Sequence, residues 1–560
     1  MKRAVIAACA SALACAAVPS LAAQGGTHVG GRSEVFAGGE LEGYLRSLQT
    51  LGQAGSYPWA LRGFSPQELD RILPRGSAHP WAARYDLRPD TVRALHLDLV
   101  RPVVALRFNS TFPYGGNDGA VWAGRGLTTS LQGGVAIRWG PLSATLAPVL
   151  FRAENVSLPL LDGGAQGDLR YNNGQFPAIV DQPQRFGPDA YARLDPGQST
   201  VRLDAFGTAI GISTANQVWG PADRFPMVLG TNAPGIPHLF LGTAAPLNAW
   251  IARVHARVIW GVLDQSPYSP VSGSRYFRSL DQPGTRRFAT GIIAVVQPRG
   301  MPGLELGGSR FFHSPWREGG PTAEDLKKPF EAIFKRDVQG DAGVTGDPFQ
   351  DFDNQVGSLF ARAHFPGSGF ELYGEFYRED HSWDLRDFLN EPDHAAGYVV
   401  GARKAFRRGQ SLVSLRGEVS NLEAQPVGLW RVEGVAYTHA YLRQGHTNRG
   451  QLLGADLGVG SSGASSFGVD WYSPRGRRSL TWTRTLRQTN HLRDSQGLLV
   501  RWSEGNPRAF DVMHALSAET LLFRGALDLV AGGGIVHNFN RNFQNDATNL
   551  TASLSVRRDF

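Results

Sequence analysis

Four side chains in one proline-rich stretch of this 560-residue sequence have the chemistry of a sugar-binding site. The stretch QVWGPADRFPMVLGTNAPGIPHLF contains Trp219, Arg224, Asn232 and His238. A sugar ring requires a flat aromatic face and a few fixed polar groups. We therefore predict that these four residues bind polysaccharide. The alternative is that Trp219 packs the stretch against a protein wall, while the prolines only stiffen it.

A second set consists of carboxylates in the stretch YGEFYREDH. Glu375 and Glu379 are four residues apart, so on a strand they share one face. Lipid tolerates two carboxylates poorly, and this face should therefore line a lumen or lie beyond the membrane. We expect Arg362 and Arg403, from adjacent strands, to pair with them in a lumen charge network. The alternative is that Glu375 and Glu379 are the catalytic carboxylates of a glycosidase. We favour the structural network, because barrel interiors are generally polar.

Other catalytic patterns are weak. The dipeptides Asp380-His381 and Asp393-His394 could suggest an outer-membrane protease, but adjacent residues on a strand point to opposite faces. The sequence contains no H-E-x-x-H, G-x-S-x-G or Walker motif, and no cluster with metal-ligand spacing. We therefore expect no catalytic residues, no metal and no cofactor, and hence a protein that is not an enzyme.

The elements that would position these residues alternate between apolar and polar side chains. Segments such as PVVALRFNSTF, TVRLDAFGTAIGIS, FELYGEFYRED and SLVSLRGEVS have this period of two. Many of the segments are paired through tight Gly/Pro turns such as Gly140-Pro141 and Pro366-Gly367. The last segment, NLTASLSVRRDF, ends on Phe560. A last strand with a terminal phenylalanine is what the outer-membrane insertion machinery generally recognises. The pattern predicts an all-β transmembrane β-barrel of about 16–18 antiparallel strands. A soluble β-sandwich or propeller is the alternative.

The N-terminal part has a different character. Residues 1–23 have the charged start, apolar stretch and small-residue cleavage site of a signal peptide, which predicts export to the outer membrane. Residues 24–97 contain an amphipathic helix ended by Gly52 and a second helix opened by the capping-box pair Ser65 and Glu68. We expect a helical periplasmic module there. The barrel would then take up residues 98–560, with long extracellular excursions at 155–198, 217–237, 265–285 and 317–355.

Composition agrees with an exported barrel. Both cysteines, Cys9 and Cys15, lie in the signal segment, so the mature chain has no disulfide and no Cys-ligated metal. The net charge is +7, and it comes almost entirely from arginine, whose planar group suits carboxylates and phosphates. Lipopolysaccharide and acidic glycans would be natural partners for these arginines. The alternative explanation of the arginine content is a general codon bias towards arginine. Export removes nucleic acid as a partner.

The proline-rich stretch also resembles the segment that marks Wzi-type capsule assembly proteins, which read Trp-Gly-Pro and later Asn-Ala-Arg-Pro-x-Pro. Four further stretches are similar in the same order: LAPVLFRAEN, DNQVGSLFARAHFPGSGFELYGEFYREDH, EPDHAAGYVVGARK and GQLLGADLGVGSS. The resemblance implies a monomeric outer-membrane barrel of about 18 strands with a periplasmic helical part. It also implies a lectin that holds capsular polysaccharide at the cell surface. This sequence departs from the pattern after Asn232-Ala233, where Pro234 replaces the usual arginine.

Three functions therefore compete. The first is a non-enzymatic outer-membrane protein that anchors exported capsular or exopolysaccharide. The second is an outer-membrane porin or substrate-specific channel, because a barrel of this size can be open. The third and least favoured is an outer-membrane hydrolase built on Glu375 and Glu379.

Overall fold

The computed structural model describes residues 29–30, 32–74, 76, 78–87, 95–272, 285–331, 353–379, 384–422, 436–439, 441–488 and 510–558. The signal segment 1–23, the dipeptide Asp380-His381 and the terminal Phe560 lie outside these residues, so the predictions made on them stay predictions.

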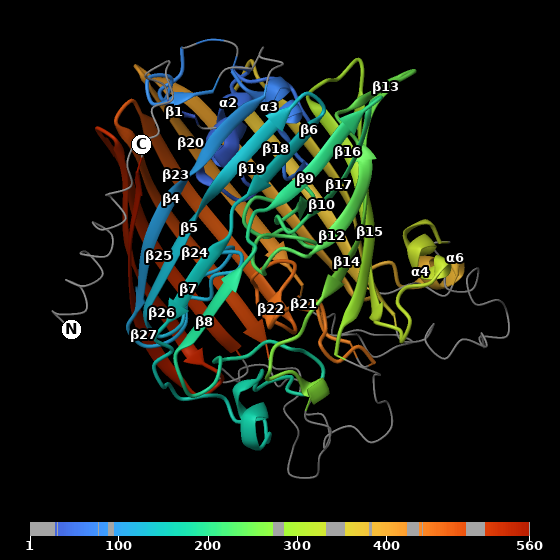
Figure 1. Ribbon diagram of the computed structural model, residues 1–560. Helices are drawn as coiled ribbons and strands as arrows, with labels where there is room; N and C mark the ends of the chain where they lie inside the picture. The colour runs from blue at the N-terminus through green and yellow to red at the C-terminus, as the bar shows by residue number, and fades with distance from the viewer. Residues whose placement is uncertain are drawn as a thin grey trace.

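The described strands form one closed barrel in which neighbours run antiparallel (Figure 1). Three wall strands are each broken in two by an interruption, giving the pairs β6/β7, β8/β9 and β12/β13. When each pair is counted as one strand, the described wall has eighteen strands. This number confirms the predicted fold class. The strands are β4 (His96–Asn109), β5 (Gly126–Trp139), β6 (Leu142–Leu146), β7 (Val149–Ala153), β8 (Tyr191–Asp195), β9 (Thr200–Ala205), β10 (Thr208–Ser213), β12 (His238–Thr243), β13 (Leu247–Ala249), β14 (Ala252–Leu263), β15 (Arg287–Pro298), β16 (Leu304–Pro315), β17 (Asn354–Phe365), β18 (Phe370–Glu379), β19 (Ala396–Arg408), β20 (Ser411–Asn421), β23 (Ser462–Ser473), β24 (Gly476–Gln488), β25 (Phe510–Arg524), β26 (Leu527–Arg541) and β27 (Asn545–Arg558).

The two ends of the described chain close the ring. β27 pairs antiparallel with β4, with Ala552 opposite Phe108 and Val556 opposite Val104. Because the last strand completes the wall beside the first, no sheet edge is left exposed at this seam.

Strand β18 shows how the period of two sets the faces of the wall. Its outward side chains Leu372 and Phe376 are 47% and 40% exposed, whereas Glu371, Glu375 and Tyr377 are 0–3% exposed. Exposed leucine, phenylalanine and tryptophan side chains continue this outer surface around the barrel. Such an apolar belt suits a lipid-facing wall. No helix among the described residues is long and apolar enough to cross a membrane.

The two ends of the barrel differ in their connections. One end, here called the short-turn end, has tight connections such as 140–141, 409–410 and 525–526. The opposite, long-loop end has the connections 110–125, 154–190 and 214–237. One long-loop connection contains α4 (Ala323–Lys327), whose capping box pairs Thr322 with Asp325 as its sequence indicates.

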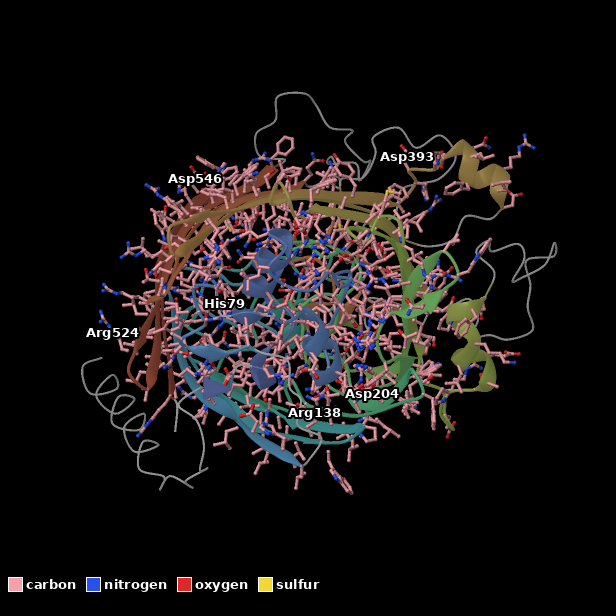
Figure 2. All side chains as sticks on the ribbon, turned by 90° about the horizontal axis from the view of Figure 1, so that it is seen from above. His79, Arg138, Asp204, Asp393, Arg524 and Asp546 are labelled. Atoms are coloured by element: carbon pink, nitrogen blue, oxygen red, sulfur yellow. The ribbon has the colours of Figure 1, made fainter. Side chains whose placement is uncertain are left out.

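The N-terminal helices lie inside the barrel at the short-turn end, surrounded by the ring of strands (Figure 2). Helix α2 (Glu40–Thr50) ends before Gly52, whose φ of +71° suits glycine, and α3 (Pro66–Ile72) opens with the predicted capping box of Ser65 and Glu68. These helices bury Leu45, Leu48, Leu69 and Ile72 against one another and the wall. The helical module is therefore a part of the barrel's filling.

Two further segments enter the lumen from the wall. Residues 214–237 turn inward after β10, and the short strand β11 (Val218–Trp219) pairs with β2 (Leu61–Arg62) of the module. Residues 441–461 meet them, since the N–H of Gly230 donates to the carbonyl of Leu453 at 2.8 Å. We call the three segments 32–87, 214–237 and 441–461 the plug. Their apolar side chains form the largest described core cluster together with inward wall residues, so the lumen is filled.

Candidate functional site

A polar cavity of about 200 Å³ lies at the long-loop end, between the plug and two long connections. Its walls combine amides, carboxylates and two aromatic rings, and they come from four separate parts of the chain. The side chains that give it this character are Tyr114, Asp118, Trp122, Gln182, Gln184, Asn232, Gln451 and Asp456. Aromatic faces beside convergent polar groups are the features of a small-molecule or glycan site.

The floor of the cavity is fixed by the plug. The Asn232 amide donates to the carbonyl of Leu452 at 3.1 Å, and the Gln451 amide donates to the carbonyls of Gly119 and Asn232 at 3.2 and 3.0 Å. The Gln451 Oε1 atom is buried and accepts no hydrogen bond from the described residues. An unsatisfied buried acceptor is costly, so this atom is suited to a donor from a ligand.

Arg224 is held beside the same cavity. Its backbone N–H donates to Glu418 on β20 at 3.0 Å, and its carbonyl accepts from the Asn117 amide at 3.0 Å. Its guanidinium donates to the carbonyl of Gly116, which lines the cavity, at 3.3 Å. Asn117 also donates its backbone N–H to Asn232 Oδ1 at 3.4 Å, so one residue joins the two predicted positions.

The charge on the cavity wall is acidic. Burial raises the pKa of Asp456 to about 6; the Arg224 guanidinium opposes this rise, and the Asp118 carboxylate adds to it. Asp118 is itself in an ion pair with Arg107 of β4. Near neutral pH the cavity therefore presents carboxylate oxygens, which accept hydrogen bonds from sugar hydroxyls and repel acidic groups.

The aromatic part of the cavity is Trp122, which is half-buried. Its ring meets those of Phe186 and Tyr191 edge to face, with centroids 5.0 and 6.2 Å away. These contacts fix the orientation of the indole while it still lines the cavity beside Tyr114. A rigid, partly exposed indole next to polar groups is suited to packing on the apolar face of a sugar.

Trp219 and His238 do not reach this cavity. Trp219 is 0% exposed, contacts Phe311 and Gly291 of the wall, and donates its indole N–H to Gln217 at 3.2 Å. The buried indole of Trp219 is not accessible to a sugar. It packs against the wall, which was the alternative interpretation of the sequence. His238 is buried at the start of β12 and contacts Gln217 and the carbonyl of Ile236. The structure thus brings together Arg224 and Asn232 from the predicted set.

The four residues of the predicted lumen network all face the interior, but the predicted pairing is wrong. Arg362 pairs with Glu305 and Glu371, and Arg403 pairs with Asp223 at 3.0 Å. The register explains the first pair, because Glu305 lies directly opposite Arg362 on the neighbouring strand.

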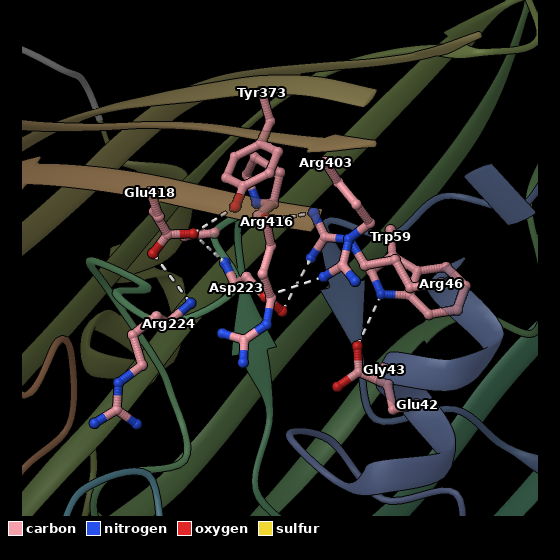
Figure 3. A network of polar contacts seen from close by, with 12 residues as sticks. Glu42, Gly43, Arg46, Trp59, Asp223, Arg224, Tyr373, Arg403, Arg416 and Glu418 are labelled. Atoms are coloured by element: carbon pink, nitrogen blue, oxygen red, sulfur yellow. Dashed lines mark hydrogen bonds and ion pairs between the residues drawn. The ribbon is translucent and has the colours of Figure 1, made fainter. Parts of the chain in front are cut away.

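The plug supplies the other members of this network. Arg46 of α2 reaches Glu371 at 2.5 Å. It also lies 3.8 Å from Asp223 (Figure 3). The Arg403 and Arg46 guanidiniums hold the pKa of Asp223 far below its ordinary value, against the opposing effect of burial. Sequence reasoning missed Arg46, Glu371 and Asp223, because no local pattern shows that the plug inserts between these strands.

Glu375 instead contacts the plug, whereas Glu379 contacts Tyr437, which precedes the plug segment 441–461, and Tyr377 of the wall. Glu379 accepts from the backbone N–H of Tyr437 at 2.9 Å and from the Tyr377 hydroxyl at 3.2 Å. Glu375 lies next to Gly220, where a Cβ atom would come within 2.3 Å of its carboxylate. No group of three or more potential metal ligands occurs in the part of the chain that the structure describes.

Comparison with known proteins identifies one fold. No protein-family model matches the chain, and no curated protein matches it in sequence. Wzi from Escherichia coli is described as a carbohydrate-binding β-barrel involved in group 1 capsule assembly. It matches with a TM-score of 0.58 over 92% of this chain and 98% of its own, at 13% identity. The chain shares the fold of Wzi. The resemblance found in the sequence is thus confirmed for the fold.

Lower structural similarity extends to other barrels. OccK5 (OpdH) from Pseudomonas aeruginosa matches at a TM-score of 0.39, 9% identity, and 84% and 99% coverage of this chain and its own. OccAB3 from Acinetobacter baumannii matches at 0.37, 9% identity, and 83% and 99% coverage.

Proposed function

We propose that this protein is an outer-membrane barrel that holds an exported polysaccharide at the cell surface without cleaving it. The polar cavity at the long-loop end is the proposed binding site. Outer-membrane barrels place short turns in the periplasm and long loops outside, so this cavity would face the exterior. The apolar belt would contact outer-membrane lipid and lipopolysaccharide. A single chain completes the ring, in keeping with a monomer, and barrel insertion machinery would be its assembly partner.

The observation that carries this proposal is that Trp122 and Gln451, whose Oε1 atom is unsatisfied among the described residues, line the same cavity. The indole supplies a surface for a sugar ring, and the amide oxygen supplies an acceptor for a sugar hydroxyl. Wzi, whose fold the chain shares, is described as carbohydrate-binding. The sugar-binding role is proposed on these grounds together.

The chemistry of the cavity also indicates which glycan would bind. Asp118 and Asp456 favour hydroxyl or ammonium donors and oppose a uronic acid. Pro234 stands where the Wzi-type pattern has arginine, so no cation follows Asn232-Ala233 in this chain. A neutral or amino-sugar polysaccharide therefore suits the cavity better than an acidic capsule.

The plug supports binding over transport. Wall and plug residues pack together with Tyr437 in one core that includes Leu229 and Leu453, and each of these three residues is at most 3% exposed. A passage for a hydrophilic substrate would have to displace these side chains, and their exposure to water is unfavourable. Conductance measurements in planar bilayers would decide between binding and transport.

Deletion of the gene, followed by measurement of polysaccharide on cells and in the medium, tests the role at the surface. We expect release of polysaccharide into the medium while total synthesis continues. A complementing Trp122→Ala variant should fail to restore retention, and wild type should restore it. Unchanged surface polysaccharide after deletion would contradict the proposal. New reducing ends after incubation of pure protein with the polysaccharide would contradict its non-enzymatic part.

A further inference from the structure

A second cavity, of about 130 Å³, lies at the opposite end of the barrel, between the helical module and the wall. It runs from His96 and Arg138, near the rim of the short-turn end, to Asn216 and Gln217 within the plug (Figure 2 labels Arg138). Its lining includes several hydroxyl and amide side chains, among them Ser65, Thr200 and Gln198. Such groups can hydrogen-bond to a polyhydroxylated molecule.

One cation in this cavity has a buried donor that finds no hydrogen-bond acceptor among the described residues. Arg257 of β14 is 3% exposed and lines the cavity, and its buried Nη2 atom donates no hydrogen bond to the described residues. Its nearest carboxylate is Glu68 of the module, with a separation of 3.8 Å. The guanidinium also lies over the ring of Phe240, 5.3 Å from the centroid, which fixes its position.

The Glu68 carboxylate has other, closer partners than Arg257. It accepts from the Tyr57 hydroxyl at 3.0 Å and from the backbone N–H of Ser65 at 2.7 Å. It is also paired with Arg202 at 3.0 Å and contacts the His255 ring at 3.1 Å. Arg202 is satisfied in turn, since it also donates to Asp204 at 2.7 Å and to the carbonyl of Ala244 at 3.1 Å. Among the described residues of this cluster, Arg257 is thus a cation with a buried donor, Nη2, that no hydrogen bond satisfies.

A buried guanidinium that lacks an acceptor lowers the stability of the fold. Its planar fork matches the two oxygens of a carboxylate or phosphate. We propose that the cavity around Arg257 binds an anionic sugar, whose carboxylate or phosphate pairs with this guanidinium and whose hydroxyls meet the surrounding polar side chains. This site is independent of the long-loop cavity and has the opposite preference for charge.

Calorimetric titration of the purified, refolded barrel tests this site with glucuronate, glucose 1-phosphate and neutral glucose. We expect one or both anions to bind at least ten-fold more tightly than glucose, and their comparison distinguishes carboxylate from phosphate. Arg257→Gln should weaken anion binding at least ten-fold. Arg257→Lys, which keeps the charge and loses the fork, should cause a smaller loss.

The matched control is Arg253→Gln, which changes an arginine on the same strand that does not line the cavity. This variant should bind both anions as wild type does. In the absence of ligand, Arg257→Gln should melt at or above the wild-type temperature, because it removes a buried charge that has no close hydrogen-bond acceptor among the described residues. Equal binding of glucose, or anion binding that Arg257→Gln leaves unchanged, would overturn the proposal. Binding of neutral glycan at the long-loop cavity should survive Arg257→Gln, which separates failure of this site from failure of the proposed function.

Discussion

The Nε atom of Arg46 lies 2.9 Å from the Glu371 carboxylate, which joins a helix of the plug to a strand of the wall more than three hundred residues away. Both side chains are fully buried. Arg362 and Thr50 also donate to this carboxylate, at 3.0 and 2.9 Å. The plug is therefore fixed to the wall by a shared, desolvated charge, and removal of that charge should loosen it.

Replacement of Glu371 by glutamine should destabilise the barrel by about 3 kcal/mol, because it leaves Arg46 and Arg362 with less compensation in a buried site. Denaturant unfolding of the refolded protein in detergent measures this loss. Glu375→Gln is the matched control on the same face of β18, since Glu375 forms no ion pair with the described residues. Equal effects of the two substitutions would show that the ion pairs do not anchor the plug.

Two tryptophans should respond differently to truncation. Trp219→Ala empties a fully buried position and should cost about 3–5 kcal/mol of stability. Trp122→Ala should leave unfolding within about 1 kcal/mol of wild type while weakening glycan binding by about ten-fold. Thermal unfolding and titration with the purified polysaccharide separate the two effects. Loss of binding in Trp219→Ala without loss of stability would instead support direct contact of Trp219 with the sugar.

The raised pKa of Asp456, about 6, gives a defined pH dependence. Folding holds this proton more tightly than the unfolded chain does, so its stabilising contribution is present at low pH and is lost as pH rises through about 6. Asp456→Asn should therefore match wild type in melting temperature below about pH 4 and exceed it above about pH 6. The control is Asp393→Asn, at an exposed position outside the cavity. A constant difference at every pH would contradict this assignment.

Conductance in planar bilayers should distinguish an anchor from a channel. The wild-type barrel should give no discrete steps, because the plug fills its lumen. The double variant Arg46→Ala and Arg403→Ala removes both cations that hold Asp223, and it should give intermittent openings as the inward segment moves. Arg253→Gln should behave as wild type. Regular wild-type steps that a small sugar blocks would favour the porin alternative.

The alternation of side chains was sufficient to predict the wall and the inward face of Glu375 and Glu379, because each strand obeys a local rule. The capping boxes at Ser65 and Thr322 were predictable for the same reason. The location of the helical module was not, since nothing local distinguishes a helix beside a barrel from a helix within it.

The site was harder to predict than the fold. Asn232 and Arg224 lie in a recognisable segment, but Trp122 and Gln451 come from connections without periodicity, hundreds of residues apart. Their proximity depends on three inward segments that meet in the lumen. The wrong partners assigned to Arg362 and Arg403 have the same origin, because Arg46 and Asp223 arrive from those segments.

The seam between β27 and β4 also constrains the order of assembly. Synthesis makes the helical module before any wall strand, yet its buried carboxylate partner on β18 follows much later. The wall cannot close until the last strand exists. The module therefore lacks its final contacts until the wall strands have been made. It must then dock on the half-formed wall or enter through the short-turn end after closure. A delay between synthesis and sealing of this kind leaves the N-terminal segment accessible to chaperones and proteases.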